Sequence, residues 1–184
     1  MIIGITGTNG AGKGTVVDYL VEKKNFSHFS VRDFLITELK KRNLEINRDN
    51  FIVIANEIRE KNNPSYIIDQ LFEKANQIDK NCIIESIRNP GEVLSLRTKS
   101  NFILLAVDAE QKIRYDRIKQ RKSETDNISF EEFKKQEEIE FNSNDINKQN
   151  ISKCIQMADY IIKNDTNIDE LNKKIEEVLN GITK

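Results

Sequence analysis

The sequence lacks tryptophan and is poor in four other residue types, with two cysteines, two prolines, one histidine and seven glycines in 184 residues. Two cysteines so far apart, Cys82 and Cys154, cannot build a disulfide framework or a zinc site of the usual spacing. An isoleucine follows each of them in the sequence, so we expect two buried thiols. The chemistry of this protein must therefore rest on other side chains.

Long apolar runs and an excess of one charge are also missing. No stretch approaches the roughly 18 to 20 consecutive apolar residues that cross a bilayer, and no basic region precedes an apolar one at the N-terminus. We therefore expect a cytoplasmic protein without a membrane partner. Lysine and arginine number 29 against 30 aspartates and glutamates, a net charge of −1. This balance argues against binding a nucleic-acid polymer, so any anionic ligand must be held by a local cluster.

Short apolar runs alternate with helical patterns along the chain. Five runs predict buried strands: Met1–Thr6, Phe26–Val31, Cys82–Ser86, Phe102–Asp108 and Asp159–Lys163. Strands that alternate with helices imply right-handed crossovers and a parallel sheet covered on both faces. We therefore predict an α/β fold of three layers, with a five-stranded parallel sheet flanked by helices in one domain, residues 1–184. The last helix is expected to stop at Gly181.

A glycine-rich segment, GTNGAGKGT, follows the first expected strand and precedes a helix. It contains G-x-x-x-x-G-K, in which glycines turn backbone N–H groups around a phosphate and the lysine reaches the β- and γ-phosphates. A dinucleotide-binding turn is disfavoured, because that turn has the spacing G-x-G-x-x-G and needs no lysine. The expected ATP-binding residues in this segment are Asn9, Gly10, Ala11, Gly12, Lys13, Gly14 and Thr15.

The letters G-A-G-K-G-T resemble the loop of the adenylate kinase group of nucleoside monophosphate kinases. Gly14 stands where most such loops carry the Ser or Thr that binds Mg²⁺, and the hydroxyl comes one residue later, at Thr15. The resemblance implies a P-loop NTPase fold with ATP and Mg²⁺ as cofactors, the metal being held largely through water. It also implies a helical acceptor-binding insert at residues 42–78 and a short lid at residues 121–146.

The segment FSVRDFL, after the second expected strand, resembles the I-S-x-x-D-x-L segment of these kinases. The resemblance implies that Asp33 lies in the hydration shell of Mg²⁺ or orients the attacking phosphate. It implies that Arg32 binds the phosphate of the acceptor. The arginine that the family usually has three residues after the aspartate is replaced by Ile36, so acceptor binding is expected to differ in detail.

The segment IIESIRNPGE, after the third expected strand, resembles the family's h-h-D-G-F-P-R-T-x-x-Q. The resemblance implies that Glu85 lies on the metal side and that Arg88 binds the acceptor phosphate. Glu92 stands where these kinases read the base with Gln. Because a carboxylate accepts hydrogen bonds and donates none, Glu92 would favour a base with an exocyclic amine.

Arg117 and Arg121 are spaced by four residues on an expected helix, so both guanidinium groups are predicted on one face, where they could clamp the transferring phosphates. This R-x-x-x-R resembles the start of the lid in the same group. The segment ADYIIKN resembles the A-D-Y-x-I-x-N strand of dephospho-coenzyme A kinases and of small archaeal-type nucleotide kinases. That resemblance implies that the backbone near Asn164 lines the adenine of ATP.

Together these motifs predict an ATP–Mg²⁺-dependent phosphotransferase that phosphorylates a nucleoside or deoxynucleoside monophosphate. The expected catalytic residues are Lys13, Asp33, Arg88, Arg117 and Arg121. Two alternatives stay open. A dephospho-coenzyme A kinase would normally have Ser or Thr in place of Gly14. A P-loop ATPase or nucleotide-binding regulator would need no phosphorylated acceptor at all.

Overall fold

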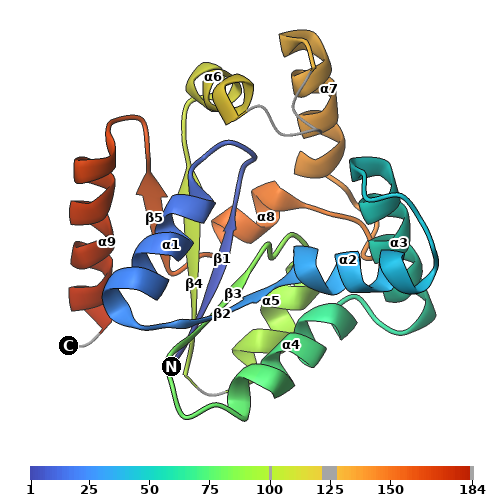
Figure 1. The fold of residues 1–184 in the computed structure, drawn as a ribbon, viewed down its shortest axis with the longest axis horizontal. Helices are drawn as coiled ribbons and strands as arrows, with labels where there is room; N and C mark the ends of the chain where they lie inside the picture. The colour runs from blue at the N-terminus through green and yellow to red at the C-terminus, as the bar shows by residue number, and fades with distance from the viewer. Residues whose placement is uncertain (100, 122–127, 183–184) are drawn as a thin grey trace.

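The sheet consists of five parallel strands within residues 1–99, 101–121 and 128–182, the part of the chain that the computed structural model describes (Figure 1). The strands are β1 (Ile2–Gly7), β2 (Ser27–Ser30), β3 (Cys82–Glu85), β4 (Phe102–Asp108) and β5 (Tyr160–Lys163). Each strand end agrees with the sequence prediction to within one residue. The predicted five-stranded parallel sheet is therefore confirmed.

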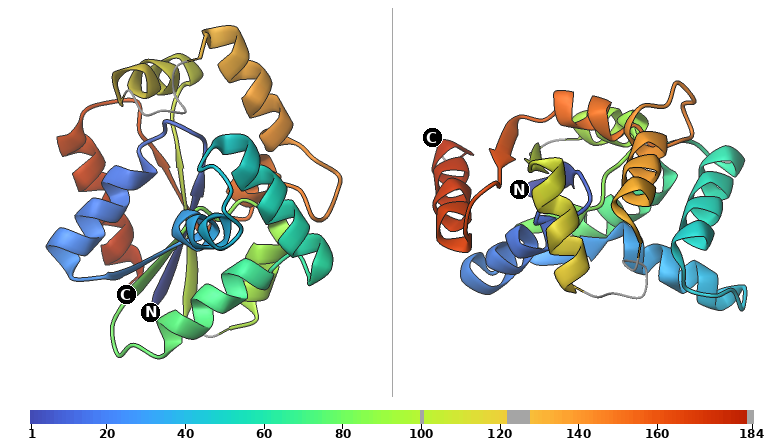
Figure 2. Two further views of the ribbon diagram at one scale, coloured as in Figure 1. Left: turned by 45° about the vertical axis from the view of Figure 1, so that its right-hand side comes forward. Right: turned by 90° about the horizontal axis from the view of Figure 1, so that it is seen from above.

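The helices cover both faces of the sheet and the carboxyl ends of its strands (Figures 1 and 2). They are α1 (Lys13–Lys24), α2 (Val31–Lys41), α3 (Arg48–Lys61), α4 (Tyr66–Asn76), α5 (Pro90–Arg97), α6 (Gln111–Arg121), α7 (Phe130–Phe141), α8 (Ile151–Gln156) and α9 (Ile168–Ile182). The predicted end of the last helix at Gly181 is wrong. The helix continues to Ile182, and Gly181 packs closely against Tyr160, where an added Cβ would lie 3.3 Å from the phenol oxygen.

Two hydrophobic clusters, one on each face of the sheet, form the core. Ile3 and Ile5 of β1 pack with residues of α1 and α9. Ile2, from the opposite face of the same strand, packs with residues of α2, α3, α4, α5 and α8. Because both faces are covered, all six residues of β1 are buried and the strand reads as a continuous apolar run. Cys82 and Cys154 are buried free thiols, as expected.

The strand order β2-β3-β1-β4-β5 places β1 at the point where the chain changes direction across the sheet. The next two strands in the sequence, β2 and β3, lie on one side of β1, and the last two, β4 and β5, lie on its other side. In open α/β sheets, ligands bind at such a switch point, beyond the carboxyl ends of the strands. Helices α6 and α7 lie beyond those ends (Figure 2). None of the helices in the described ranges is both long enough and apolar enough to span a membrane.

Candidate active site

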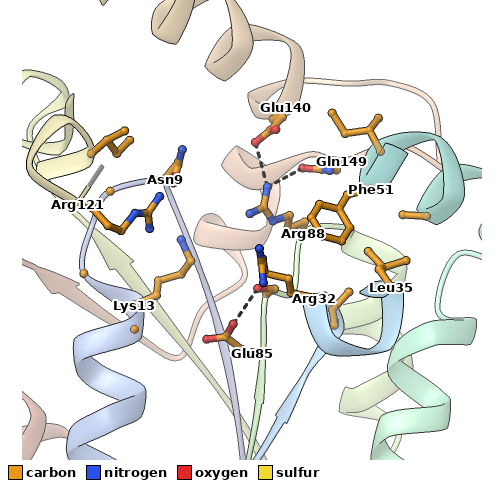
Figure 3. A pocket seen from close by; sticks show the side chains of 18 of the residues that line it. Asn9, Lys13, Arg32, Leu35, Phe51, Glu85, Arg88, Arg121, Glu140 and Gln149 are labelled. Carbon is orange, nitrogen blue, oxygen red and sulfur yellow. Dashed lines mark hydrogen bonds and ion pairs between the residues drawn. The ribbon is translucent and has the colours of Figure 1, made fainter. Parts of the chain in front are cut away.

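A cleft of about 780 Å³ opens beyond the carboxyl ends of β1 and β3 (Figure 3). Its walls come from the β1–α1 loop, α2, α3, the residues after β3, α6 and α7. Most of the site residues expected from the sequence line this cleft: Asn9, Gly10, Gly12, Lys13, Gly14, Thr15, Arg32, Glu85, Arg88, Arg117 and Arg121. Four others, Ala11, Asp33, Glu92 and Asn164, are not among its lining residues.

The β1–α1 loop needs glycine because its backbone enters the left-handed region. Gly10 has φ +79° and Gly12 has φ +98°, values that other residues adopt only with strain. A Cβ on Gly12 would also lie 2.4 Å from Nδ2 of Asn164. That amide nitrogen donates a hydrogen bond of 2.8 Å to the carbonyl of Ala11. Asn164, which is buried, therefore holds the loop in place from behind.

Arg114 is a second support of the loop, and the sequence analysis missed it. This arginine of α6 is buried, and its Nη1 donates to the carbonyl of Asn9 at 3.3 Å. The same guanidinium pairs with Glu137 of α7, where Nη2 lies 3.1 Å from Oε2. Arg114 thus connects the glycine-rich loop to α7. Its partners are remote in the sequence, so no local pattern indicates that this helical arginine has a structural role at the loop.

Lys13 folds back over the loop that precedes it. Its Nζ donates to the carbonyls of Gly7, at 3.0 Å, and Thr8, at 2.7 Å. Burial and, to a smaller extent, the positive charge of Arg88 lower the pKa of Lys13 to about 7, against the opposing effect of Glu85. A phosphate oxygen beside Nζ would favour the charged form.

Binding of a polyphosphate is therefore expected to draw about one proton onto Lys13 at about pH 8.5. The lysine is mostly neutral at that pH when its pKa is about 7, so the apparent affinity should fall as the pH rises above that value. Calorimetric titration with ADP in two buffers of different ionisation enthalpy measures the proton uptake. The control is Lys13→Gln, which should remove the buffer dependence; its persistence in that variant would contradict the prediction.

Glu85 ends β3 and faces the cleft beside Ser86. Its Oε1 accepts a hydrogen bond of 3.2 Å from the Ser86 hydroxyl, and its Oε2 lies 3.8 Å from Nε2 of His28. Ser86 has φ +67°, a left-handed conformation that is uncommon for a residue with a side chain. Strained residues of this kind concentrate at functional sites, and Ser86 lines the cleft. Ser86 is not among the site residues expected from the sequence.

Two arginines line the side of the cleft nearest α2 and α3. Arg88 donates from Nη1 to Oε2 of Glu140, at 3.0 Å, and to Oε1 of Gln149, at 3.2 Å (Figure 3). Arg32 lies over the ring of Phe51, with its guanidinium carbon 5.2 Å from the ring centroid. Both side chains are thus held by neighbours while they line the cleft.

The structure corrects the role expected for Glu92. This carboxylate is fully buried. Its Oε2 accepts from the backbone N–H of Arg88, at 2.9 Å, and of Asn89, at 3.0 Å, which completes a capping box at the start of α5. Its Oε1 pairs with Arg59 at 2.8 Å. The prediction that Glu92 reads a base is wrong, because both of its carboxylate oxygens already accept hydrogen bonds from buried groups of the protein.

Two further expected catalytic residues, Arg117 and Asp33, have surroundings that the sequence did not indicate. Arg117 lines the cleft, but it donates to the carbonyls of Asn164, at 2.8 Å, and Thr166, at 3.1 Å. It therefore supports the loop after β5 in this structure, and Arg121 lines the same cleft. Asp33 is exposed in the first turn of α2, outside the cleft lining. Of the expected lid, residues 122–127 lie outside the described residues.

Oxygen donors suited to Mg²⁺ are among the residues that line the cleft, including the hydroxyl of Thr15 and the carboxylate of Glu85. Within the described ranges, no group of three or more His, Cys, Asp or Glu side chains gathers as metal ligands. Mg²⁺ usually keeps several waters and takes one or two carboxylates together with substrate phosphates. The two oxygen donors therefore fit a magnesium ion held largely through water.

Comparison with known proteins agrees with this fold. A UPF0200 protein of Sulfurisphaera tokodaii is 30% identical, over 98% of this chain and 97% of that protein. Two solved structures share the P-loop kinase-like fold. A shikimate kinase from Aquifex aeolicus has a TM-score of 0.56 at 19% identity and covers 98% of this chain and 97% of its own. A gluconokinase from Sinorhizobium meliloti has a TM-score of 0.59 at 11% identity, and the match covers 98% of this chain and 90% of the gluconokinase.

The family assignment rests on sequence, because structural likeness at these identities shows the fold alone. The model of the AAA domain family matches residues 3–141, which is most of the chain. The match includes the glycine-rich loop and the Glu85–Arg88 segment, both of which line the cleft. The chain therefore belongs to the AAA domain family, and its relative from Sulfurisphaera tokodaii places it among the UPF0200 proteins.

Proposed function

We propose that this protein is an ATP–Mg²⁺-dependent phosphotransferase that moves the γ-phosphate to a nucleoside or deoxynucleoside monophosphate. One observation carries the proposal: cationic side chains from separate parts of the chain, among them Lys13, Arg32, Arg88 and Arg121, line the same cleft. Lys13 suits a nucleoside triphosphate on the glycine-rich loop. Arg32 and Arg88, near α2 and α3, suit a second phosphorylated ligand. The shikimate kinase and the gluconokinase with similar folds support a small-molecule acceptor.

The residues of the cleft would act by positioning and by offsetting charge. Backbone N–H groups of residues 9–15 would hold the ATP phosphates, and Asn164 and Arg114 would keep that loop in shape. Lys13 and Arg121 would offset charge on the transferring group, while Arg88 orients the acceptor phosphate. Mg²⁺, when bound near Thr15 and Glu85, supplies charge neutralisation between the phosphates.

Two segments would enclose the acceptor. Residues 42–78, which include α3 and α4, would form the acceptor-binding region, and residues 121–146, which include α7, would form the lid. Closure of these segments keeps water from taking the place of the acceptor. Glu140 at the end of α7 pairs with Arg88, so the lid and the acceptor side are in contact.

The experiment that tests the proposal measures ADP formation with each ribo- and deoxyribonucleoside monophosphate, with dephospho-coenzyme A and without an acceptor. We expect ADP formation that depends on a nucleoside monophosphate and yields an equal amount of phosphorylated product. Hydrolysis of ATP at the same rate without an acceptor would overturn the proposal in favour of an ATPase. Turnover with dephospho-coenzyme A alone would also overturn it.

A further inference from the structure

A buried ion pair forms part of the acceptor side of the cleft. Arg59 of α3 is 3% exposed and lines the cleft, and its Nη2 donates to Oε1 of Glu92 at 2.8 Å. Its other two nitrogens, Nε and Nη1, are buried and have no hydrogen-bond partner among the described residues. Arg59 therefore brings unused donors to the wall of a site where a ligand is expected.

Unused buried donors carry a free-energy cost that a ligand could remove. A buried N–H group without a partner loses its hydration and gains nothing in return. A guanidinium group has five N–H donors and no acceptor. The ligand atoms that face Arg59 must therefore be hydrogen-bond acceptors, and a donor placed there would meet another donor.

Apolar side chains line the same part of the cleft. Leu35 of α2 and Phe51, Ile52 and Ala55 of α3 are among its lining residues. Phe51 also carries the Arg32 guanidinium over its ring. These side chains suit a flat, largely apolar ring better than a small, highly charged molecule. This side of the cleft thus has cations that can bind a phosphate and apolar side chains that can pack against a ring. Arg59 can donate a hydrogen bond to an oxygen on that ring.

On the basis of the proposed function, we propose that Arg59 selects nucleotides whose base presents a carbonyl oxygen at its far edge. Uracil, thymine and guanine carry such an oxygen, whereas adenine and cytosine carry an exocyclic amine at the corresponding edge. This preference is the reverse of the one expected from Glu92 alone. The reversal arises because Glu92 is turned toward Arg59, which leaves the arginine to meet the ligand.

The proposal is tested by comparing kcat/KM for UMP, dTMP and GMP with kcat/KM for CMP and AMP. We expect the first group to be preferred by about ten- to a hundredfold, because the wrong base leaves a buried donor of Arg59 without a partner. Arg59→Lys keeps a cation opposite Glu92 but loses the planar fork of donors, so it should reduce the preference. Arg59→Met combined with Glu92→Gln removes the donors without leaving a charge unpaired, and should abolish it. Arg97→Lys, at the exposed Arg97–Asp159 pair, is the matched control.

Equilibrium binding of UMP and CMP, measured by calorimetry, separates this proposal from the proposed function. Absence of turnover with every acceptor would count against the phosphotransferase, while tighter binding of UMP that is lost in the double variant would still support the role of Arg59. Equal or tighter binding of CMP by the unmodified protein would overturn that role. A preference for UMP that survives unchanged in the folded double variant would overturn it as well.

Discussion

Replacing Lys13 with methionine is expected to lower the rate of acceptor-dependent phosphoryl transfer by about a hundred- to a thousandfold. Lys13 is the cation of the glycine-rich loop, and methionine has a similar length but offers neither charge nor donor to a phosphate. The measurement is ADP formation at saturating ATP and with the best acceptor of the panel.

The fold should survive this change, so the loss can be assigned to chemistry. Nζ of Lys13 makes two hydrogen bonds to backbone carbonyls, and no carboxylate is paired with it in the described part of the chain. A matched control is Lys23→Met, because Lys23 is exposed in the last turn of the same helix. A folded Lys13→Met protein that transfers phosphate as fast as this control would exclude Lys13 from the reaction.

Replacing Arg59 alone with methionine is expected to lower the free energy of unfolding by about 3–5 kcal/mol. Glu92 is fully buried, and its Oε1 faces Arg59. Without the arginine, a carboxylate would remain in the protein interior with no compensating charge. Unfolding in urea, followed by circular dichroism, measures the difference.

The double variant Arg59→Met/Glu92→Gln should recover much of that loss, since the neutral amide can still accept from the backbone of Arg88 and Asn89. The control is Lys112→Met at the exposed pair of Lys112 and Asp116, which should leave the unfolding midpoint almost unchanged. If Arg59→Met unfolds at the same urea concentration as this control, the Arg59–Glu92 pair contributes nothing to stability.

Local patterns predicted the sheet and the glycine-rich loop well because the physics that shapes them is local. Strands buried on both faces read as apolar runs wherever they occur, and β1 illustrates this with six buried residues. The loop requires left-handed backbone at Gly10 and Gly12, so glycine at those positions follows from geometry. Lys13 then falls at the start of α1, where the spacing placed it.

The roles of individual charged side chains were harder to predict, because their partners are remote in sequence. Glu92 is paired with an arginine 33 positions earlier, and nothing near Glu92 in the sequence indicates that contact. Arg114, Arg117 and Arg121 follow each other along one helix, yet Arg114 supports the glycine-rich loop and Arg117 supports the loop after β5. Helical spacing predicts the face of the helix on which a side chain lies, but it does not predict which distant group that side chain contacts.

The central place of β1 in the sheet also has a consequence for biosynthesis. β1 is made before the other four strands of this sheet, but its neighbours β3 and β4 begin only at Cys82 and Phe102. At about 5–20 residues per second, β1 waits about 5 to 20 s before its second neighbour has been made. Until β3 has been made, both hydrogen-bonding edges of β1 lack their native partners, and one edge still lacks its partner until β4 follows. The innermost strand of the sheet therefore stays incompletely paired for seconds after its own synthesis.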